Sequence, residues 1–145
     1  MESNLIANSQ ITINVPAAKV WEALTKPELI KKYLFGTEAK SDWKVGSPIT
    51  YKGVWEGKAY EDKGVILEFV PNKKLVSTYW SGFAGKPDVP ENYQKVSYEL
   101  EEKDGQTTLK ITQENNPTAE SAEHSGDNWK MVLGKMKEIL EIQTN

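Results

Sequence analysis

The chain has 145 residues, of which 38% are apolar and 27% are charged, a length and balance typical of one globular domain. It contains no cysteine, which excludes disulfides, thiolate metal ligands and cysteine nucleophiles. All eighteen basic residues are lysines and the net charge is -3, so neither bidentate arginine contacts nor a basic stripe along a nucleic-acid backbone is expected. We therefore predict a single domain over residues 1–145 that binds no nucleic acid.

The first third of the chain predicts one strand followed by two short helices. Apolar residues alternate with polar ones over residues 5–15, which indicates a half-buried strand. Pro16 suits the first position of a helix, and the apolar residues after it recur at helical spacing as far as Leu24. Pro27 then begins a second short helix that ends near Leu34.

The middle of the chain predicts strands joined by short turns. Asp104-Gly105 is the strongest hairpin signal and Pro71-Asn72 is a second turn, so the strands beside them must be antiparallel. The segment 82–92 contains two glycines and two prolines and predicts a long loop, which either covers a pocket mouth or simply connects two strands. The predicted strands cover roughly residues 37–43, 47–55, 57–70, 74–81, 92–102 and 106–114.

An apolar stripe at a spacing of 3.6 residues predicts one long helix from about residue 120 to residue 143, and the stripe includes Trp129, Leu133 and Met136. At 1.5 Å per residue, this helix would be about 30 Å or more in length, enough to cross a sheet. The whole order of elements predicts an α+β fold in which a curved antiparallel sheet wraps around the long C-terminal helix.

Several motifs in this order carry a family resemblance. Residues 20–25 with Pro27 read V-W-E-A-L-T followed by proline, residues 44–46 form a K-V-G turn, and a glycine, glutamate, proline and tryptophan are spaced along residues 64–80. The chain resembles the activator of heat-shock-protein-90 ATPase homologue family, within the START-like or helix-grip superfamily. The likeness covers nearly the whole chain.

The chain departs from the family pattern at two positions near the expected pocket. The family commonly has a histidine where this chain has Gln113, and a glycine where this chain has Asn128. The ligand of this protein is therefore expected to differ from those of its relatives.

The resemblance implies a domain that holds a hydrophobic or amphipathic ligand between sheet and helix. Some helix-grip proteins act as cyclases or hydrolases, and a chaperone activator carries this domain after an N-terminal domain that supplies most of the stimulation. Because only one domain is predicted here, the resemblance favours ligand binding over chaperone activation.

Two titratable residues are candidates for catalysis. His124 is the only histidine, and the acidic residues around it suit the positive end of a helix dipole without any catalytic role. A buried Glu68 would be a candidate acid or base, but strict alternation places it opposite Val65, Leu67 and Phe69, toward solvent. We predict no catalytic residue and no metal site. No glycine-rich phosphate loop joins a strand to a helix, so no cofactor is predicted either.

The chain has five tryptophans, six tyrosines and three phenylalanines, whose large, rigid rings suit the wall of an apolar pocket. Tyrosine hydroxyls and indole N–H groups can also form hydrogen bonds inside such a pocket. Alternate strand residues and one stripe of the final helix must face the same interior. We therefore predict a pocket for a neutral or weakly acidic hydrophobic small molecule, lined by Tyr51, Trp55, Tyr98, Ile111, Gln113, Trp129 and Leu133.

Two other functions stay open. A cyclase-like or hydrolase-like enzyme would use the same pocket with Tyr98, Glu68 or His124 moving protons, whereas a chaperone partner would use its surface. No stretch approaches the roughly 18 consecutive apolar residues of a spanning helix, and the first eight residues do not resemble a secretion signal. We expect a cytoplasmic monomer without a membrane span.

Overall fold

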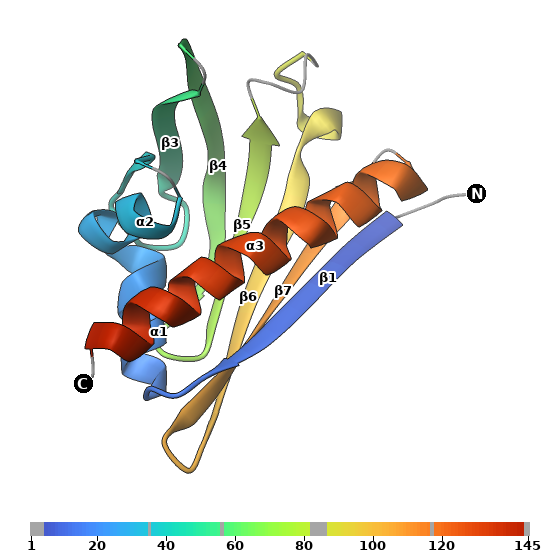
Figure 1. Ribbon diagram of the computed structural model, residues 1–145. Coiled ribbons are helices and arrows are strands. Elements are labelled where there is room, and N and C mark those ends of the chain that lie inside the picture. Colours follow the sequence, from blue (N-terminus) through green and yellow to red (C-terminus); the bar gives the residue numbers. More distant parts are fainter. Residues whose placement is uncertain (1–4, 35, 56, 82–86, 117, 144–145) are drawn as a thin grey trace.

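The computed structural model describes residues 5–34, 36–55, 57–81, 87–116 and 118–143. Within them, seven strands form one antiparallel sheet in the order β1-β7-β6-β5-β4-β3-β2. Helix α3 crosses one face of this curved sheet, and α1 and α2 lie beside its C-terminal half (Figure 1). The predicted α+β helix-grip fold is confirmed. The elements are β1 (Leu5–Ile13), α1 (Ala17–Thr25), α2 (Pro27–Tyr33), β2 (Glu38–Ser41), β3 (Pro48–Trp55), β4 (Lys58–Val70), β5 (Lys74–Ser81), the 3-10 turn η2 (Pro90–Asn92), β6 (Gln94–Lys103), β7 (Gln106–Asn116) and α3 (Ala119–Gln143).

The local patterns at the N-terminus have the expected outcome. On β1 and the residues after it, Ala7, Ile13 and Val15 are buried, as period-two alternation predicted. The helix α1 begins after Pro16, which has no side chain able to cap it, and the carboxylate of Glu102 on β6 accepts the Ala17 N–H at 2.7 Å instead. A distant strand therefore satisfies one of the free N–H groups at this helix end.

The predicted turns are present with the backbone that their residues favour. Asp104 and Gly105 both have positive φ, 54° and 80°, which is the signature of a two-residue type I′ hairpin. Asn72 also has positive φ, in the turn between β4 and β5. These tight turns fix the register of the antiparallel strand pairs.

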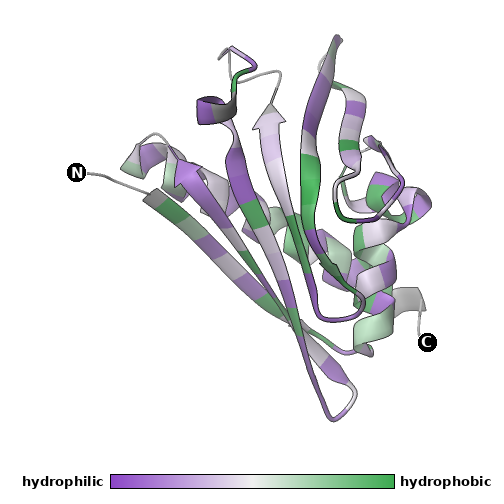
Figure 2. Ribbon diagram, turned by 180° about the vertical axis from the view of Figure 1, so that it is seen from behind, coloured by the Kyte–Doolittle hydropathy of each residue, from purple (hydrophilic) through white to green (hydrophobic). Residues whose placement is uncertain are grey.

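Strand β4 departs from the strict alternation expected of it. Ile66 is fully buried and its neighbours Val65 and Leu67 are exposed, but a bulge between Ile66 and Glu68 shifts the pairing with β5 and leaves Glu68 exposed as well. Phe69 returns to the interior, where its ring lies 5.1 Å from that of Trp21. The expectation that Val65, Leu67 and Phe69 share one face was therefore wrong. In Figure 2 this part of β4 is coloured as a hydrophobic stretch along the strand.

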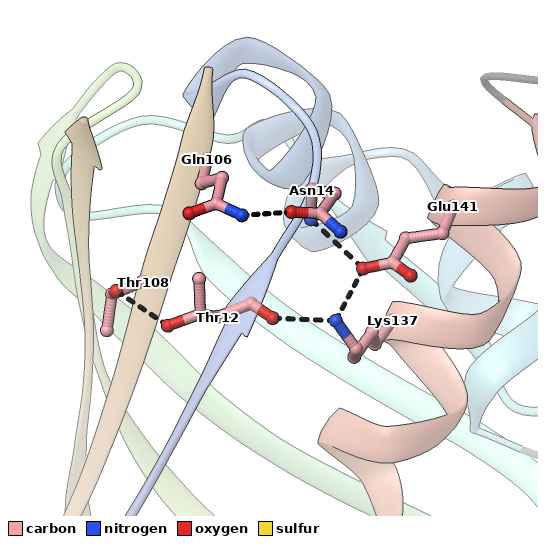
Figure 3. Close-up of polar contacts among 6 residues, drawn as sticks. All are labelled: Thr12, Asn14, Gln106, Thr108, Lys137 and Glu141. Atoms are coloured by element: carbon pink, nitrogen blue, oxygen red, sulfur yellow. Dashed lines mark hydrogen bonds and ion pairs between the residues drawn. The ribbon is translucent and has the colours of Figure 1, made fainter. Parts of the chain in front are cut away.

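The long helix α3 supplies the centre of the core and is also tied to the sheet edge. Leu133 and Met136 are each 1% exposed. On its polar side, Lys137 Nζ donates to the carbonyl of Thr12 at 2.9 Å, and Glu141 accepts the N–H of Asn14 at 3.0 Å (Figure 3). These groups belong to the edge strand β1 and the residue after it, so α3 covers backbone groups that a free edge would leave exposed.

Among the described residues, no helix has both the length and the apolar character needed to cross a membrane.

Candidate functional site

A cavity of about 770 Å³ lies between the inner face of the sheet and α3, with α2 at one end. This volume is in the range of small-molecule binding sites. Aromatic and aliphatic side chains make up most of its wall, and a smaller number of amide, hydroxyl and carboxylate groups interrupt them. The lining residues are Leu24, Tyr33, Leu34, Thr37, Tyr51, Tyr60, Asp62, Leu75, Ser77, Tyr79, Gln94, Val96, Tyr98, Gln113, His124, Ser125, Asn128, Trp129, Met131, Val132 and Met136.

Three of the tyrosines in the wall are anchored by hydroxyl hydrogen bonds. Tyr33 on α2 donates to the carbonyl of Ala23 at 2.8 Å, and Tyr79 on β5 donates to Asp62 Oδ2 at 2.9 Å. The hydroxyl of Tyr60 is hydrogen-bonded to Thr37. These bonds fix the positions of the rings before any ligand arrives.

The ring of Tyr60 also depends on a glycine in the neighbouring strand. Gly53 lies opposite Tyr60 in the β3–β4 pairing, and a Cβ built on Gly53 would lie 2.5 Å from the Tyr60 hydroxyl. The absence of a side chain at Gly53 therefore leaves the space that this ring occupies.

Tyr51 and Tyr98 present polar groups to the cavity. Within the part of the chain that the structure describes, neither hydroxyl has a hydrogen-bond partner. Burial raises the pKa of both hydroxyls above their ordinary value, so both are protonated at neutral pH. Each can therefore donate one hydrogen bond to a ligand and accept another.

A chain of amides closes the end of the cavity near the start of α3. Trp129 Nε1 donates to Gln113 Oε1 at 2.8 Å, and Gln113 Nε2 donates to Gln94 Oε1 at 2.6 Å. Gln94 Nε2 continues to Asn116 Oδ1 at 3.1 Å, which also accepts the hydroxyl of Ser125 at 3.2 Å. Because each amide both donates and accepts, the chain fixes the orientation of Gln113 and of the Trp129 indole.

The Trp129 ring packs edge-on against Tyr98, with centroids 5.9 Å apart and an interplanar angle of 88°. This is a favoured geometry for aromatic pairs. The indole is thus held on both its polar and its apolar side.

Asp62 is the only carboxylate among the described lining residues. It lies on β4 directly opposite Tyr51 on β3, and it accepts the hydrogen bond from Tyr79. Burial is the largest cause of the raised pKa of Tyr51, and the charges of neighbouring tyrosines and of Asp62 add to it.

Four of the seven residues predicted to bind a ligand lie in the cavity wall: Tyr51, Tyr98, Gln113 and Trp129. Contact with a ligand stays a prediction for each of them. Ile111 and Leu133 are instead in the apolar core, at 0% and 1% exposure, and are absent from the wall, so we leave them out of the site. Trp55 ends β3, and its side chain lies outside the described residues.

Sequence reasoning missed Tyr33, Tyr60, Asp62, Tyr79 and Gln94. The alternation of Tyr60 and Asp62 along β4 is a signal that both point to one face. Which face is internal depends on the pairing with β3, and a single sequence does not provide this register.

The two candidate acid–base residues occupy different places. His124 is exposed on the first turns of α3 and lines the cavity. Glu68 is exposed, lies 3.7 Å from Lys74 in an ion pair, and is not part of the wall. In the described part of the chain, no three histidine or acidic residues gather in a group that could hold a metal ion.

Residues 14–141 match the family model of the activator of Hsp90 ATPase homolog 1-like proteins. The chain belongs to this family. The resemblance found in the sequence motifs is thereby confirmed. A search of curated proteins finds no match to the chain.

Solved structures with the same fold are similar to the chain over nearly its whole length. The solution structure of ChR145 from Cytophaga hutchinsonii is 48% identical, with a TM-score of 0.86 and 99% of each chain covered. Protein MLL2253 from Mesorhizobium loti is 22% identical, with a TM-score of 0.76 and coverage of 97% of this chain and 98% of that one. The Aha1 dimer from Colwellia psychrerythraea is 24% identical, with a TM-score of 0.73 and coverage of 99% of this chain and 100% of that one.

Proposed function

We propose that this protein is a ligand-binding domain that holds a hydrophobic or amphipathic small molecule between the sheet and α3. The observation that carries the proposal is the cavity of about 770 Å³, in which anchored aromatic rings surround the hydroxyls of Tyr51 and Tyr98, neither of which has a hydrogen-bond partner among the described residues. An apolar wall with a few oriented polar groups is the usual composition of a small-molecule site. The family model that matches the chain is consistent with this role.

The proposal is tested by recovering and titrating ligands. Organic extracts of the purified protein are analysed by mass spectrometry, and fatty acids, aromatic polyketides and sterol-like compounds are titrated while thermal unfolding is followed. A bound ligand raises the unfolding temperature because it binds only the folded state. If no apolar compound binds more tightly than about 1 mM, roughly -4 kcal/mol, the pocket hypothesis is contradicted.

An enzyme that uses the same cavity is the first alternative. Tyr98 and His124 line the cavity, where either could meet a ligand. Glu68 lies outside the cavity and is no longer a candidate acid or base. The same titrations separate the two functions, because a binding protein returns its ligand unchanged and an enzyme converts it. We favour the non-catalytic role.

A surface-mediated role with a chaperone is the second alternative, and the name of the matching family is its support. Co-purification of a chaperone from lysate, together with stimulation of its ATPase activity by the purified chain, would favour it. We expect the chain to be a cytoplasmic monomer. The Colwellia psychrerythraea relative is a dimer, so light scattering on the purified chain is the measurement that decides the oligomeric state.

A further inference from the structure

Three tyrosines flank Asp62 on the inner face of the sheet. Tyr51 is directly opposite it in the β3–β4 pairing, where facing Cβ atoms are about 4.5 to 5.5 Å apart. Tyr60 precedes Asp62 by two residues on β4 and lines the same cavity, because side chains at i and i+2 share a face. Tyr79 reaches Asp62 from β5 with a hydrogen bond of 2.9 Å. The carboxylate therefore lies among phenol rings.

Among the described residues, the cavity wall carries one acidic side chain and no lysine. The acidic residue is Asp62, while His124 lies on α3 at the exposed side. The next residue along β4, Lys63, points to the opposite face of the sheet, where it lies 2.5 Å from Asp88 and over the ring of Trp80. The inner face thus combines a negative charge with aromatic surface.

We propose that the ligand is an amphipathic organic cation, whose ammonium group binds Asp62 among Tyr51, Tyr60 and Tyr79 while its apolar body fills the rest of the cavity. This inference rests on the proposed function. A carboxylate is a strong acceptor for ammonium N–H groups, and the faces of tyrosine rings attract cations. Both attractions are stronger in a partly desolvated cavity than in water.

The same arrangement selects against organic anions. A fatty-acid carboxylate near Asp62 would meet a like charge, and the described wall offers no lysine to offset it. The expectation of a neutral or weakly acidic ligand came from a sequence reading that did not place Asp62 in the pocket.

Three compounds with one apolar body test the inference: 4-phenylbutylamine, 4-phenyl-1-butanol and 4-phenylbutyrate, titrated at pH 7 by isothermal calorimetry. We expect the amine to bind at least about tenfold more tightly than the alcohol, and the carboxylate to bind most weakly. In Asp62→Asn the amine should lose that advantage and bind within about threefold of the alcohol. Asp104→Asn, the same substitution in an exposed turn, should leave all three affinities as in the wild type.

The outcomes separate the two proposals. If the alcohol binds and the amine has no advantage, or if Asp62→Asn keeps the advantage, the charge inference is overturned and the proposed function stands. If none of the three binds, the charge inference is overturned, and the titrations of fatty acids, polyketides and sterol-like compounds decide the proposed function. Binding of the alcohol by Asp62→Asn also demonstrates that this variant is folded. A second variant, Tyr51→Leu, should weaken binding of the 4-phenylbutyl-trimethylammonium ion more than Tyr51→Phe does, because only the phenylalanine keeps a ring beside the cation.

Discussion

Replacing Met136 by alanine tests whether α3 supplies the centre of the core. Its side chain is 1% exposed and packs with Leu133 and Leu140 in the main apolar cluster. Removing such a buried side chain costs about 2 to 5 kcal/mol, through lost transfer free energy and the cavity that remains. For a chain of this size, about 3 °C per kcal/mol then gives a fall in Tm of roughly 6 to 15 °C.

The helix provides its own control. Met131 lies on the same helix but is 55% exposed, so Met131→Ala should change the free energy of unfolding by no more than about 0.5 kcal/mol. Both variants are measured by urea unfolding followed by circular dichroism, with the slope m compared to confirm two-state behaviour. A loss below about 0.5 kcal/mol at Met136, or equal losses at the two positions, would refute the packing of α3 described above.

Three further predictions concern the contacts of Glu141 on α3, a turn and the sole histidine. The hydrogen bond from Lys137, and to a smaller extent that from the backbone N–H of Asn14, lowers the pKa of Glu141 below its ordinary value of 4.5. The ionised Glu141 carboxylate therefore stabilises the folded state above that ordinary pKa, and this stabilisation is lost as the pH falls through the lowered pKa of the folded protein. The stability difference between wild type and Glu141→Gln, measured by urea unfolding at pH 7 and at pH 3, should therefore shrink at the lower pH. An unchanged difference would contradict a stabilising role for the bonds of Glu141 to Lys137 and Asn14. Gly105→Ala should destabilise the protein by about 1 kcal/mol, because φ is 80° there, and equal stability would argue against the type I′ turn. His124→Ala should leave ligand affinity within about threefold of wild type, whereas a hundredfold loss, about 2.7 kcal/mol, would assign His124 to the binding machinery.

The sequence predicted well those features that depend on neighbours along the chain. The alternation of β1, the hairpin at Asp104-Gly105 and the stripe of α3 are local signals, and each has the expected outcome. The bulge after Ile66 was not predictable in this way, because it depends on how β4 pairs with β5. It left Glu68 exposed and turned Phe69 inward, whereas strict alternation had placed Phe69 on the same face as Val65 and Leu67.

The candidate site was only partly predictable for a related reason. Periodicity states which face of an element is internal, but it does not state how far the cavity extends along that face. Leu133 lies on the same apolar stripe of α3 as Trp129, yet Leu133 packs in the hydrophobic core and Trp129 lines the cavity. Ile111 and Gln113 divide in the same way on β7.

The most direct test of ligand binding in this cavity is the indole N–H signal of Trp129 in a nitrogen–proton correlation spectrum, assigned by its loss in Trp129→Phe. The indole donates to Gln113 inside the cavity wall, whereas that of Trp80 donates to Pro87 outside it. Titration with 4-phenyl-1-butanol should shift the Trp129 signal in a saturable manner and leave the Trp80 signal in place. A Trp129 signal that stays unmoved at saturating ligand, or that moves no more than the Trp80 signal, would contradict binding in the cavity.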